Sequence, residues 1–391
     1  MFVGLTNTPR DYAWGSETAI AELLGRTPSG GPEGEYWLGT HAGNPSGLLD
    51  GPGGSTTLDE IVTLPFILKV LAAQTSLSLQ AHPSPAQAEA GFARENALGI
   101  PLDAGQRNYK DALHKPELIY AISERFEALC GFRSVAATRE LLVGLGPDPL
   151  VAGFIGRLVD DASIPEVFEW LISNGEDIAE LRERVLELAP TAAAPEFAAA
   201  LRLSEQFPGD VGILISLLLN LVTLHAGEVV YLPAGNIHAY QHGLGIEVLA
   251  ASDNVLRGGL TPKHVDVPEL LTVLDFRPIP VPFLEPVMPV AGLALFRPDV
   301  PDFELAVIVP QAAVEGSVAY DAASAFVAIC TEGELTITGS SGQKTVARGG
   351  AVFGSADESP LTFTGEGKLF LAATNSATNS ATNGTSSDTA G

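Results

Sequence analysis

The sequence predicts a mainly β protein that carries an α-helical insertion. Three observations lead to this fold class. Short apolar runs alternate with Gly- and Pro-rich turns before residue 130 and again after residue 225, which is typical of short strands. Apolar residues recur at helical spacing between about residues 134 and 224. A proline-rich bridge at residues 277–282 precedes a second set of alternating strands, so we expect two β-domains plus a helical domain.

Composition narrows the class of protein. The chain has 391 residues, of which 46% are hydrophobic and 17% charged, as in globular proteins. It has no apolar run of 18 residues, and its start lacks the basic and apolar regions of a signal peptide. The two cysteines form no disulfide framework and suit the cytoplasm. The net charge of −26 argues against nucleic acid or an anionic membrane as a partner.

The N-terminal segment contains two of the three tryptophans, each in a polar-aromatic cluster. Trp14 lies among small residues, and Trp37 lies between Glu35 and His41. Large aromatic residues often anchor a β-core. They also wall carbohydrate sites, and both interpretations remain open for these two.

A strand with an unusual polar face follows the apolar strand expected at residues 63–71. In the stretch 77–82, Leu77, Leu79 and Ala81 would face one way, whereas Ser78, Gln80 and His82 would face the other. Pro83 then ends the strand, because proline cannot extend a central ladder. The polar row either faces water or lines a polar cavity.

Helix-start signals continue the pattern. Ser84 at an N-cap position before Pro85 predicts a helix to about residue 96. Residues 111–120 return to strand character, with Lys115 and Glu117 on one face.

In the helical insertion we expect a capping box at residues 163–166 and further helices at 177–188 and 195–207. The apolar run 211–224 is too short to span a membrane and is interpreted as a buried helix. The final residues, from Thr374, repeat Ser-Ala-Thr-Asn and predict a disordered tail.

The strongest chemical signal is the spacing Gly-x5-Pro-x-Gly-x-x-His, which ends at His238. It resembles the second metal motif of the cupin superfamily, although a lone histidine is more often a core residue. Gln80 and His82 lie at strand spacing, and Glu117 is the nearest suitable carboxylate. This donor set suits a divalent ion, most plausibly Zn²⁺. Spacing alone does not choose zinc over iron, manganese or cobalt.

Six stretches in this order resemble the type I phosphomannose isomerase family. They are residues 12–16, 35–41, 78–83, 114–117, 233–240 and 252–263. The resemblance covers residues 1–130 and 225–270 well, and it implies two cupin-like jelly-roll domains plus a helical insertion. The expected domains are a metal-bearing catalytic cupin domain (1–130 and 225–272), the helical insertion (131–224), a metal-free cupin-like domain (273–373) and the tail (374–391).

The resemblance implies one zinc per subunit, bound by Gln80, His82, Glu117 and His238. It implies interconversion of mannose 6-phosphate and fructose 6-phosphate by proton transfer between C2 and C1, within mannose metabolism or GDP-mannose supply. Moving that proton needs a base and positive charge near the enediolate oxygens. The candidate catalytic residues are Arg257, Lys115, His114, Asp253 and His41. The candidate substrate-binding residues are Trp14, Glu35, Ser78, Tyr240, Glu247 and Lys263.

Charge supports a phosphosugar substrate. Lys115, Arg257 and Lys263 are three of only 21 basic residues, and all lie in the matched stretches. The competing interpretation is a surface ion-pair cluster of Asp253, Arg257 and Lys263. Other open alternatives are a different metal-dependent cupin enzyme acting on sugars, such as an iron-dependent oxygenase, and a catalytically silent sugar-phosphate-binding protein. We expect a monomer, and the base at C2 and C1 stays unassigned.

Overall fold

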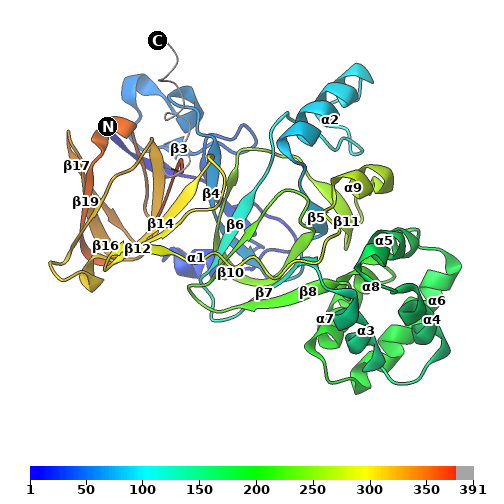
Figure 1. Cartoon of the computed structure of the whole chain (residues 1–391). Coiled ribbons are helices and arrows are strands. Elements are labelled where there is room, and N and C mark those ends of the chain that lie inside the picture. Colours follow the sequence, from blue (N-terminus) through cyan, green and yellow to red (C-terminus); the bar gives the residue numbers. More distant parts are fainter. Residues whose placement is uncertain (376–391) are drawn as a thin grey trace, which may run out of the picture.

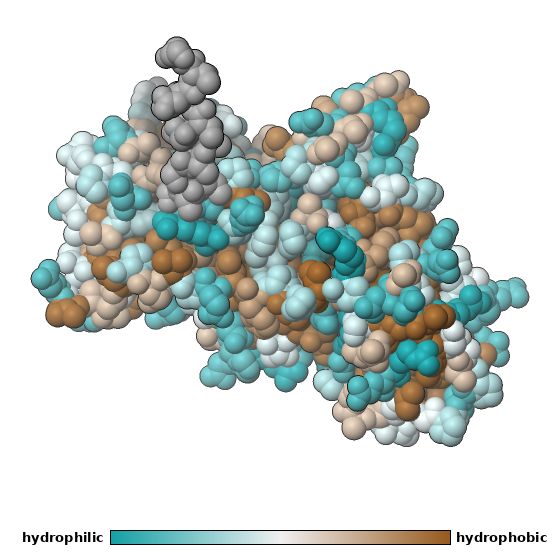
Figure 2. All heavy atoms as spheres, in the orientation of Figure 1, coloured by the Kyte–Doolittle hydropathy of each residue, from teal (hydrophilic) through white to brown (hydrophobic). Residues whose placement is uncertain are grey.

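The computed structural model, described for residues 1–375, contains two β-sheets and a helical block (Figure 1). The sheet built mostly from C-terminal strands lies at the left of Figure 1, the central sheet lies in the middle, and the helical block lies at the lower right. The mainly β architecture with a helical insertion agrees with the expectation from sequence. On the face drawn in Figure 2, polar residues are spread over all three parts. Among residues 1–375, no helix is long and apolar enough to cross a membrane.

The central sheet has nine strands and carries the polar row of residues 78–82. Its longest strand pairs with four others and is fully buried over most of its length. The strands are β2 (Glu35–Gly39), β4 (Phe66–Ala73), β5 (Leu79–Ala81), β6 (Glu117–Ala121), β7 (Phe126–Phe132), β8 (Leu219–Leu224), β9 (Val229–Leu232), β10 (His238–Ala250) and β11 (Leu256–Gly259). The predicted strand at 63–71 is confirmed as β4, whereas only the end of the predicted strand 111–120 is extended, as β6.

The second sheet has ten strands. They are β1 (Phe2–Thr6), β3 (Gly47–Leu48), β12 (Val287–Val290), β13 (Leu293–Phe296), β14 (Glu304–Ile308), β15 (Ser317–Tyr320), β16 (Phe326–Thr338), β17 (Gln343–Ala347), β18 (Ala351–Gly354) and β19 (Leu361–Ala373). The strand β1 pairs antiparallel with β18, and β3 pairs with β1. The sheets therefore do not follow the expected boundary at the start of the chain, because two N-terminal strands complete the C-terminal sheet.

The two sheets pack against each other through aromatic rings. The ring centroid of Tyr120 on β6 lies 5.8 Å from that of Phe296 and 5.0 Å from that of Phe370, both with edge-on geometry. These residues belong to one apolar cluster that takes strands from both sheets. Edge-to-face aromatic pairs of this kind add specificity to the apolar burial.

The helices are α1 (Ala19–Leu23), α2 (Pro85–Ala97), α3 (Val135–Val143), α4 (Pro149–Arg157), α5 (Ile164–Ile172), α6 (Glu176–Leu188), α7 (Pro195–Gln206), α8 (Gly212–Ser216) and α9 (Val267–Val273). The predicted start of α2 is confirmed, because Ser84 and Gln87 form a reciprocal capping box. The helices predicted at 177–188 and 195–207 are confirmed as α6 and α7.

Two predictions in the insertion are wrong. The run 211–224 is helical only in α8 and then forms β8, which pairs with β7. A short apolar run fits a buried helix or a buried strand equally well. The pairing with β7 therefore decides that this part of the run is a strand. Ser163 forms no capping box, because it ends the 3-10 turn Asp161–Ser163 and its hydroxyl donates to the Asp160 carbonyl.

The predicted tail lies outside the described residues except for its first two. Of these, Asn375 is packed, since its amide donates to the carbonyls of Pro298 and Val300 at 2.7 and 3.0 Å. The prediction of disorder is therefore wrong for Asn375, and the rest of the predicted tail lies outside the described residues.

Candidate metal centre and active site

Three strands of the central sheet bring the metal-ligand candidates together. His238 begins β10 and pairs with Gln80 of β5, while Glu117 begins β6, which also pairs with β10. The turn before His238 contains Gly235 at φ +79°, a conformation that favours glycine. The amide of Gly235 donates to the His82 carbonyl at 2.9 Å. The Pro-Gly turn thus fixes His82 and His238 relative to each other.

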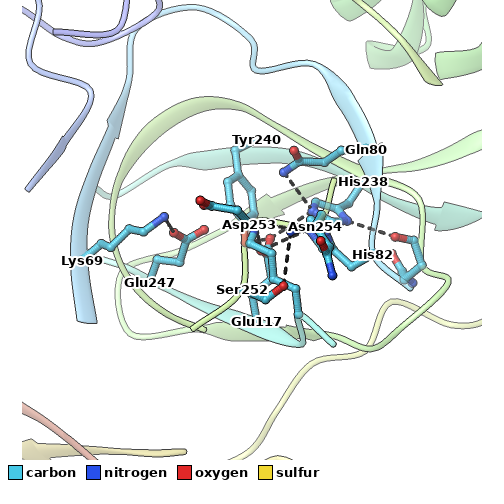
Figure 3. Close-up of polar contacts among 12 residues, drawn as sticks. Lys69, Gln80, His82, Glu117, His238, Tyr240, Glu247, Ser252, Asp253 and Asn254 are labelled. Carbon is cyan, nitrogen blue, oxygen red and sulfur yellow. Dashed lines mark hydrogen bonds and ion pairs between the residues drawn. The ribbon is translucent and has the colours of Figure 1, made fainter. Parts of the chain in front are cut away.

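The side chains of these residues converge on one buried point (Figure 3). The Glu117 carboxylate lies 3.3 Å from His82 Nε2 through Oε2 and 3.0 Å from His238 Nε2 through Oε1. The Gln80 amide nitrogen lies 3.3 Å from His238 Nε2, and rotating that amide by half a turn places its oxygen there. His82, Glu117 and His238 are at most 2% exposed. The polar face of β5 therefore points into this buried cluster at His82, while Gln80 is partly exposed.

Both histidines are oriented by backbone carbonyls. His82 Nδ1 lies 2.7 Å from the Asn254 carbonyl, and His238 Nδ1 lies 3.0 Å from the Asn236 carbonyl. A proton on each Nδ1 satisfies these contacts and leaves each Nε2 free as a donor atom. Such outer partners are typical of metal-binding histidines.

Electrostatics keep the donor atoms of His82 and Glu117 deprotonated. Burial, with the nearby Lys115 ammonium, lowers the pKa of His82 to about 4. Burial alone would raise the pKa of Glu117, but Lys115 and His238 hold it well below its usual range. The Tyr240 hydroxyl donates to Glu117 Oε1 at 3.1 Å, and burial beside that carboxylate raises the pKa of Tyr240. His82 and Glu117 are therefore able to bind a metal ion at neutral pH without first losing a proton.

The donor set fits a tetrahedral divalent ion. The ligand atoms of His82, Glu117 and His238 all lie within 4.8 Å of one another, and several pairs lie at 3.0–3.3 Å. Bonds of about 2.1 Å in a tetrahedron place neighbouring donors about 3.4 Å apart. Nitrogen and carboxylate donors suit a borderline ion such as Zn²⁺.

The His82 environment predicts a pH dependence for the metal-free protein. The folded-state pKa of about 4 lies below the ordinary 6.5, so the unfolded chain takes up the proton first as pH falls. We expect His82 to contribute stability above pH 6.5 and to lose about 3 kcal/mol of it as pH falls towards 4. The measurement is urea unfolding in chelator at pH 7.5 and 4.5. The variant His82→Gln should lack this part of the loss, and equal losses in both proteins would contradict the assignment.

A second buried polar group lies beside the cluster, on three neighbouring strands. Lys69 of β4 is the direct cross-strand neighbour of Trp37 on β2 and of Glu247 on β10. Its Nζ lies 3.0 Å from Glu247 Oε2, 3.5 Å from Glu35 Oε2 and 4.6 Å from the Trp37 ring centroid. The Trp37 indole donates to Glu35 Oε2 at 2.6 Å. Glu35 and Glu247 thus lie in a buried ion network centred on Lys69.

The pKa of Lys69 and the pKa of Glu247 are both raised in this network, for different reasons. Burial alone would lower the pKa of Lys69, but the carboxylates of Glu247 and Glu35 raise it above its ordinary value. Burial raises the pKa of Glu247 to about 7, with Lys69 opposing and the carboxylates of Glu117 and Glu35 adding to it. Lys69 therefore stays charged, and Glu247 titrates near neutrality.

Three cations gather without carboxylate partners. Arg257 on β11 is paired in register with Gln80. Burial, followed by the charges of Arg257 and Lys110, lowers the pKa of Lys263, so Lys263 lies near both of the other cations. No ion-pair partner for them occurs within residues 1–375. The ion pairs of the competing interpretation, between Asp253 and Arg257 or Lys263, are therefore absent from residues 1–375.

The other candidates lie around this centre at different distances. His41 Nε2 lies 3.4 Å from Asp253 Oδ2, and the His41 ring packs on Trp37. Lys115 Nζ lies 3.3 Å from Glu117 Oε2 and 3.4 Å from His82 Nε2, inside the centre. His114 Nε2 instead lies 2.9 Å from Asp302 Oδ2, at the second β-domain. The structure thus brings Lys115 into the cluster and directs His114 elsewhere.

Trp14 and Ser78 are both partly buried. Trp14 stacks on Tyr12 at 5.3 Å and packs against the apolar cluster that contains Tyr240. Ser78 directly precedes β5, two residues before Gln80. The Ser78 hydroxyl forms no hydrogen bond within residues 1–375.

Sequence reasoning missed Lys69, Lys110, Asn254 and Asp111. Asn254 is fully buried, and its side chain contacts the backbone of Lys110, Asp111 and Leu113, while its carbonyl contacts His82. Lys69 carried a signal, since a lysine inside an otherwise apolar strand needs a buried partner. Lys110 carried none beyond being a basic residue in an acidic chain.

Comparison with known proteins decides the family. A model of the type I phosphomannose isomerase catalytic domain matches residues 2–135. The mannose-6-phosphate isomerase of Escherichia coli (strain K12) is 38% identical over 93% of this chain and 97% of that protein. The chain belongs to the type I phosphomannose isomerase family. The human mannose-6-phosphate isomerase is 31% identical, over 90% of this chain and 92% of that protein.

Solved phosphomannose isomerases share the fold along the whole chain. A zinc-bound mannose 6-phosphate isomerase matches with a TM-score of 0.86 and 33% identity, covering 96% of this chain and 99% of that one. The metal-free enzyme from Salmonella typhimurium matches with a TM-score of 0.85. Membership in the phosphomannose isomerase family therefore extends to the helical insertion and to the second β-domain.

Proposed function

We propose that this protein is a zinc-dependent mannose-6-phosphate isomerase, which interconverts mannose 6-phosphate and fructose 6-phosphate. The observation that carries the proposal is the buried cluster of His82, Glu117 and His238 beside three unpaired cations. A metal centre alone would suit many cupin enzymes. The neighbouring cations can bind a phosphate group. Membership in the type I phosphomannose isomerase family agrees with the metal cluster and with the phosphate site.

Gln80, His82, Glu117 and His238 would hold one zinc ion. When bound, zinc supplies positive charge that stabilises the negative oxygens of the enediolate. Lys115 lies 3.3 Å from Glu117 and holds its carboxylate in the ionised form. Tyr240 binds the other oxygen of Glu117, so the carboxylate has a fixed orientation.

Arg257, Lys263 and Lys110 would bind the phosphate group of the sugar. Arginine and lysine side chains commonly donate hydrogen bonds to phosphate groups. None of these three side chains forms an ion pair with a carboxylate within residues 1–375, so all three are available to a phosphate. Of these three cations, Arg257 lies directly across from Gln80, on the strand that pairs with β5. It would therefore also add positive charge near the reacting carbons.

The remaining residues would handle protons and sugar contacts. His41 and Asp253 form a partly exposed pair suited to ring opening, whereas His114 would act there only after leaving Asp302. Trp14 and Ser78 would contact the sugar from the wall of the site. Glu35 and Glu247 would act through Lys69, and Glu247, with a pKa of about 7, could exchange a proton near neutral pH.

The test is conversion of mannose 6-phosphate to fructose 6-phosphate with and without a chelator. We expect turnover to disappear with the chelator and to return with added Zn²⁺, because the ion supplies charge that the side chains cannot replace. Absence of turnover with every divalent metal would overturn the proposal. Oxygen uptake in the presence of metal would favour the oxygenase alternative. Phosphosugar binding without turnover would favour the silent binding protein.

We further propose that the protein acts as a cytoplasmic monomer with the second β-domain as a metal-free packing partner. Cys130 and Cys330 are both free and buried, which suits a reducing compartment. The aromatic contacts of Tyr120 with Phe296 and Phe370 support the packing role.

A further inference from the structure

The turn that follows β11 has a backbone conformation that its sequence does not favour. Gly259 has φ +128°, and Leu260 has φ +53°, one of two non-glycine residues in the left-handed region within residues 1–375. Leucine is strained in that region, because its Cβ crowds the following carbonyl oxygen. The Leu260 side chain is 1% exposed and belongs to the core shared with the helical block. Something outside the turn must therefore hold it.

The carboxylate of Asp210, in the helical insertion, makes that contact. Its Oδ1 accepts from the amides of Leu260 at 2.9 Å and Gly212 at 2.7 Å, and its Oδ2 accepts from the amide of Thr261 at 3.1 Å. The Thr261 hydroxyl in turn accepts from the amide of Lys263 at 3.1 Å. A chain of hydrogen bonds thus runs from the insertion to one of the unpaired cations.

The contact between the insertion and the turn is also sterically tight. A Cβ on Gly259 would lie 3.0 Å from Gly212 Cα and 3.1 Å from Asp210 Oδ1, and a Cβ on Gly212 would lie 2.8 Å from Leu260 Cγ. The same segment of the insertion also contacts the residues just before β5, since Gln206 Oε1 accepts a hydrogen bond from the Ser76 amide at 2.9 Å. The segment 206–212 therefore braces both the start of β5 and the end of β11.

We infer that Asp210 is a positioning residue for phosphosugar binding, which gives the helical insertion a role in the site. The inference rests on the proposed function, because it takes Arg257 and Lys263 as phosphate ligands. Asp210 touches no substrate. It holds the left-handed turn that sets the distance between Arg257, on the strand before the turn, and Lys263, after it.

The test compares Asp210→Ala and Asp210→Asn with the unchanged protein. We expect Asp210→Ala to raise KM for mannose 6-phosphate by about tenfold to a hundredfold, since small displacements of binding groups have effects of this size. Zinc content should not change. Asp210→Asn keeps one oxygen for Leu260 and Gly212 but replaces the other with an amide facing Thr261, so its KM should rise less. If the alanine variant fails to fold, Asp210→Asn still tests the inference.

The matched control is Asp148→Ala, in the same insertion. Asp148 also accepts from two backbone amides, those of Leu150 and Val151, and it binds Arg184, but it contacts no residue of the turn. We expect this variant to lower the melting temperature without changing KM. An equal rise in KM in both variants would show a general weakening of the insertion and would overturn the inference.

Two further readouts separate positioning from general destabilisation. Amide hydrogen exchange at Leu260 and Thr261 should become faster in Asp210→Ala, and binding of inorganic phosphate should weaken. In a Lys263→Ala background, the Asp210 substitution should have much less effect on KM, because both changes act on one contact. Full additivity of the two changes would overturn the inference.

These measurements also distinguish the two proposals. If the unchanged protein does not isomerise mannose 6-phosphate, the proposed function fails, while exchange and inorganic phosphate binding still report on Asp210. If it isomerises and Asp210→Ala keeps the same KM, phosphate affinity and exchange rates, only the positioning role fails.

Discussion

Replacing Glu117 with alanine is expected to abolish both the bound zinc and the isomerase activity. Glu117 is fully buried and contacts both histidines, Lys115 and Tyr240. Without its carboxylate, the donor set loses its only negative charge, and Lys115 is left as a buried cation without a counterion. The measurements are zinc per protein by atomic emission and turnover of mannose 6-phosphate. Full activity in a metal-free Glu117→Ala protein would refute the proposed ligand set.

A control separates this effect from the loss of any buried carboxylate. Glu127 on β7 is also buried, and it pairs with Arg125 and Arg202, away from the metal cluster. We expect Glu127→Ala to lower stability while retaining zinc. The variant Glu117→Gln should lose most of its zinc while keeping the shape of the side chain, because the amide cannot supply the charge.

The variant Lys69→Met should lose about 3–5 kcal/mol of folding stability at pH 8, because it leaves Glu35 and Glu247 buried without a counterion. The loss should be smaller at pH 5. Glu247 already has a folded pKa of about 7, above its ordinary 4.5, although Lys69 opposes the rise. Removing Lys69 raises this pKa further, so at pH 5 the folded variant holds a proton on Glu247 that relieves the uncompensated charge. The measurement is the free energy of unfolding from urea titrations at the two pH values.

The matched control for this prediction is an exposed ion pair. Lys368 Nζ lies 3.6 Å from Glu332 Oε1, with the two side chains 31% and 64% exposed. Lys368→Met should change stability by less than about 1 kcal/mol at either pH. A similar small change in Lys69→Met would mean that the buried network does not depend on its central cation.

Much of the site was predictable because its signals are local. Alternation along residues 77–82 separated Gln80 and His82 from the apolar face, and the Pro-Gly spacing singled out His238. These patterns follow from the two-residue period of a strand and from the turn conformation that only glycine readily adopts. Helix caps are local too, which explains why the start of α2 was predicted correctly.

The parts of the fold that were not predicted depend on pairing between strands that lie far apart in the sequence. The run 211–224 could be a helix or a strand, and its pairing with β7 made its second half β8. The strands β1 and β3 look local to the first domain, yet they complete the C-terminal sheet.

The amino-acid sequence by itself determined the donor types, their strand spacing and the family, because these depend on residue identity and on neighbours along the chain. Only the tertiary structure decided that Lys69 neutralises Glu35 and Glu247, that His114 faces Asp302, and that Asp210 of the insertion holds the turn before Lys263. These contacts join residues 34 to 188 positions apart. Their partners are chosen by which strands and helices pack together, and no local pattern in the chain encodes that choice.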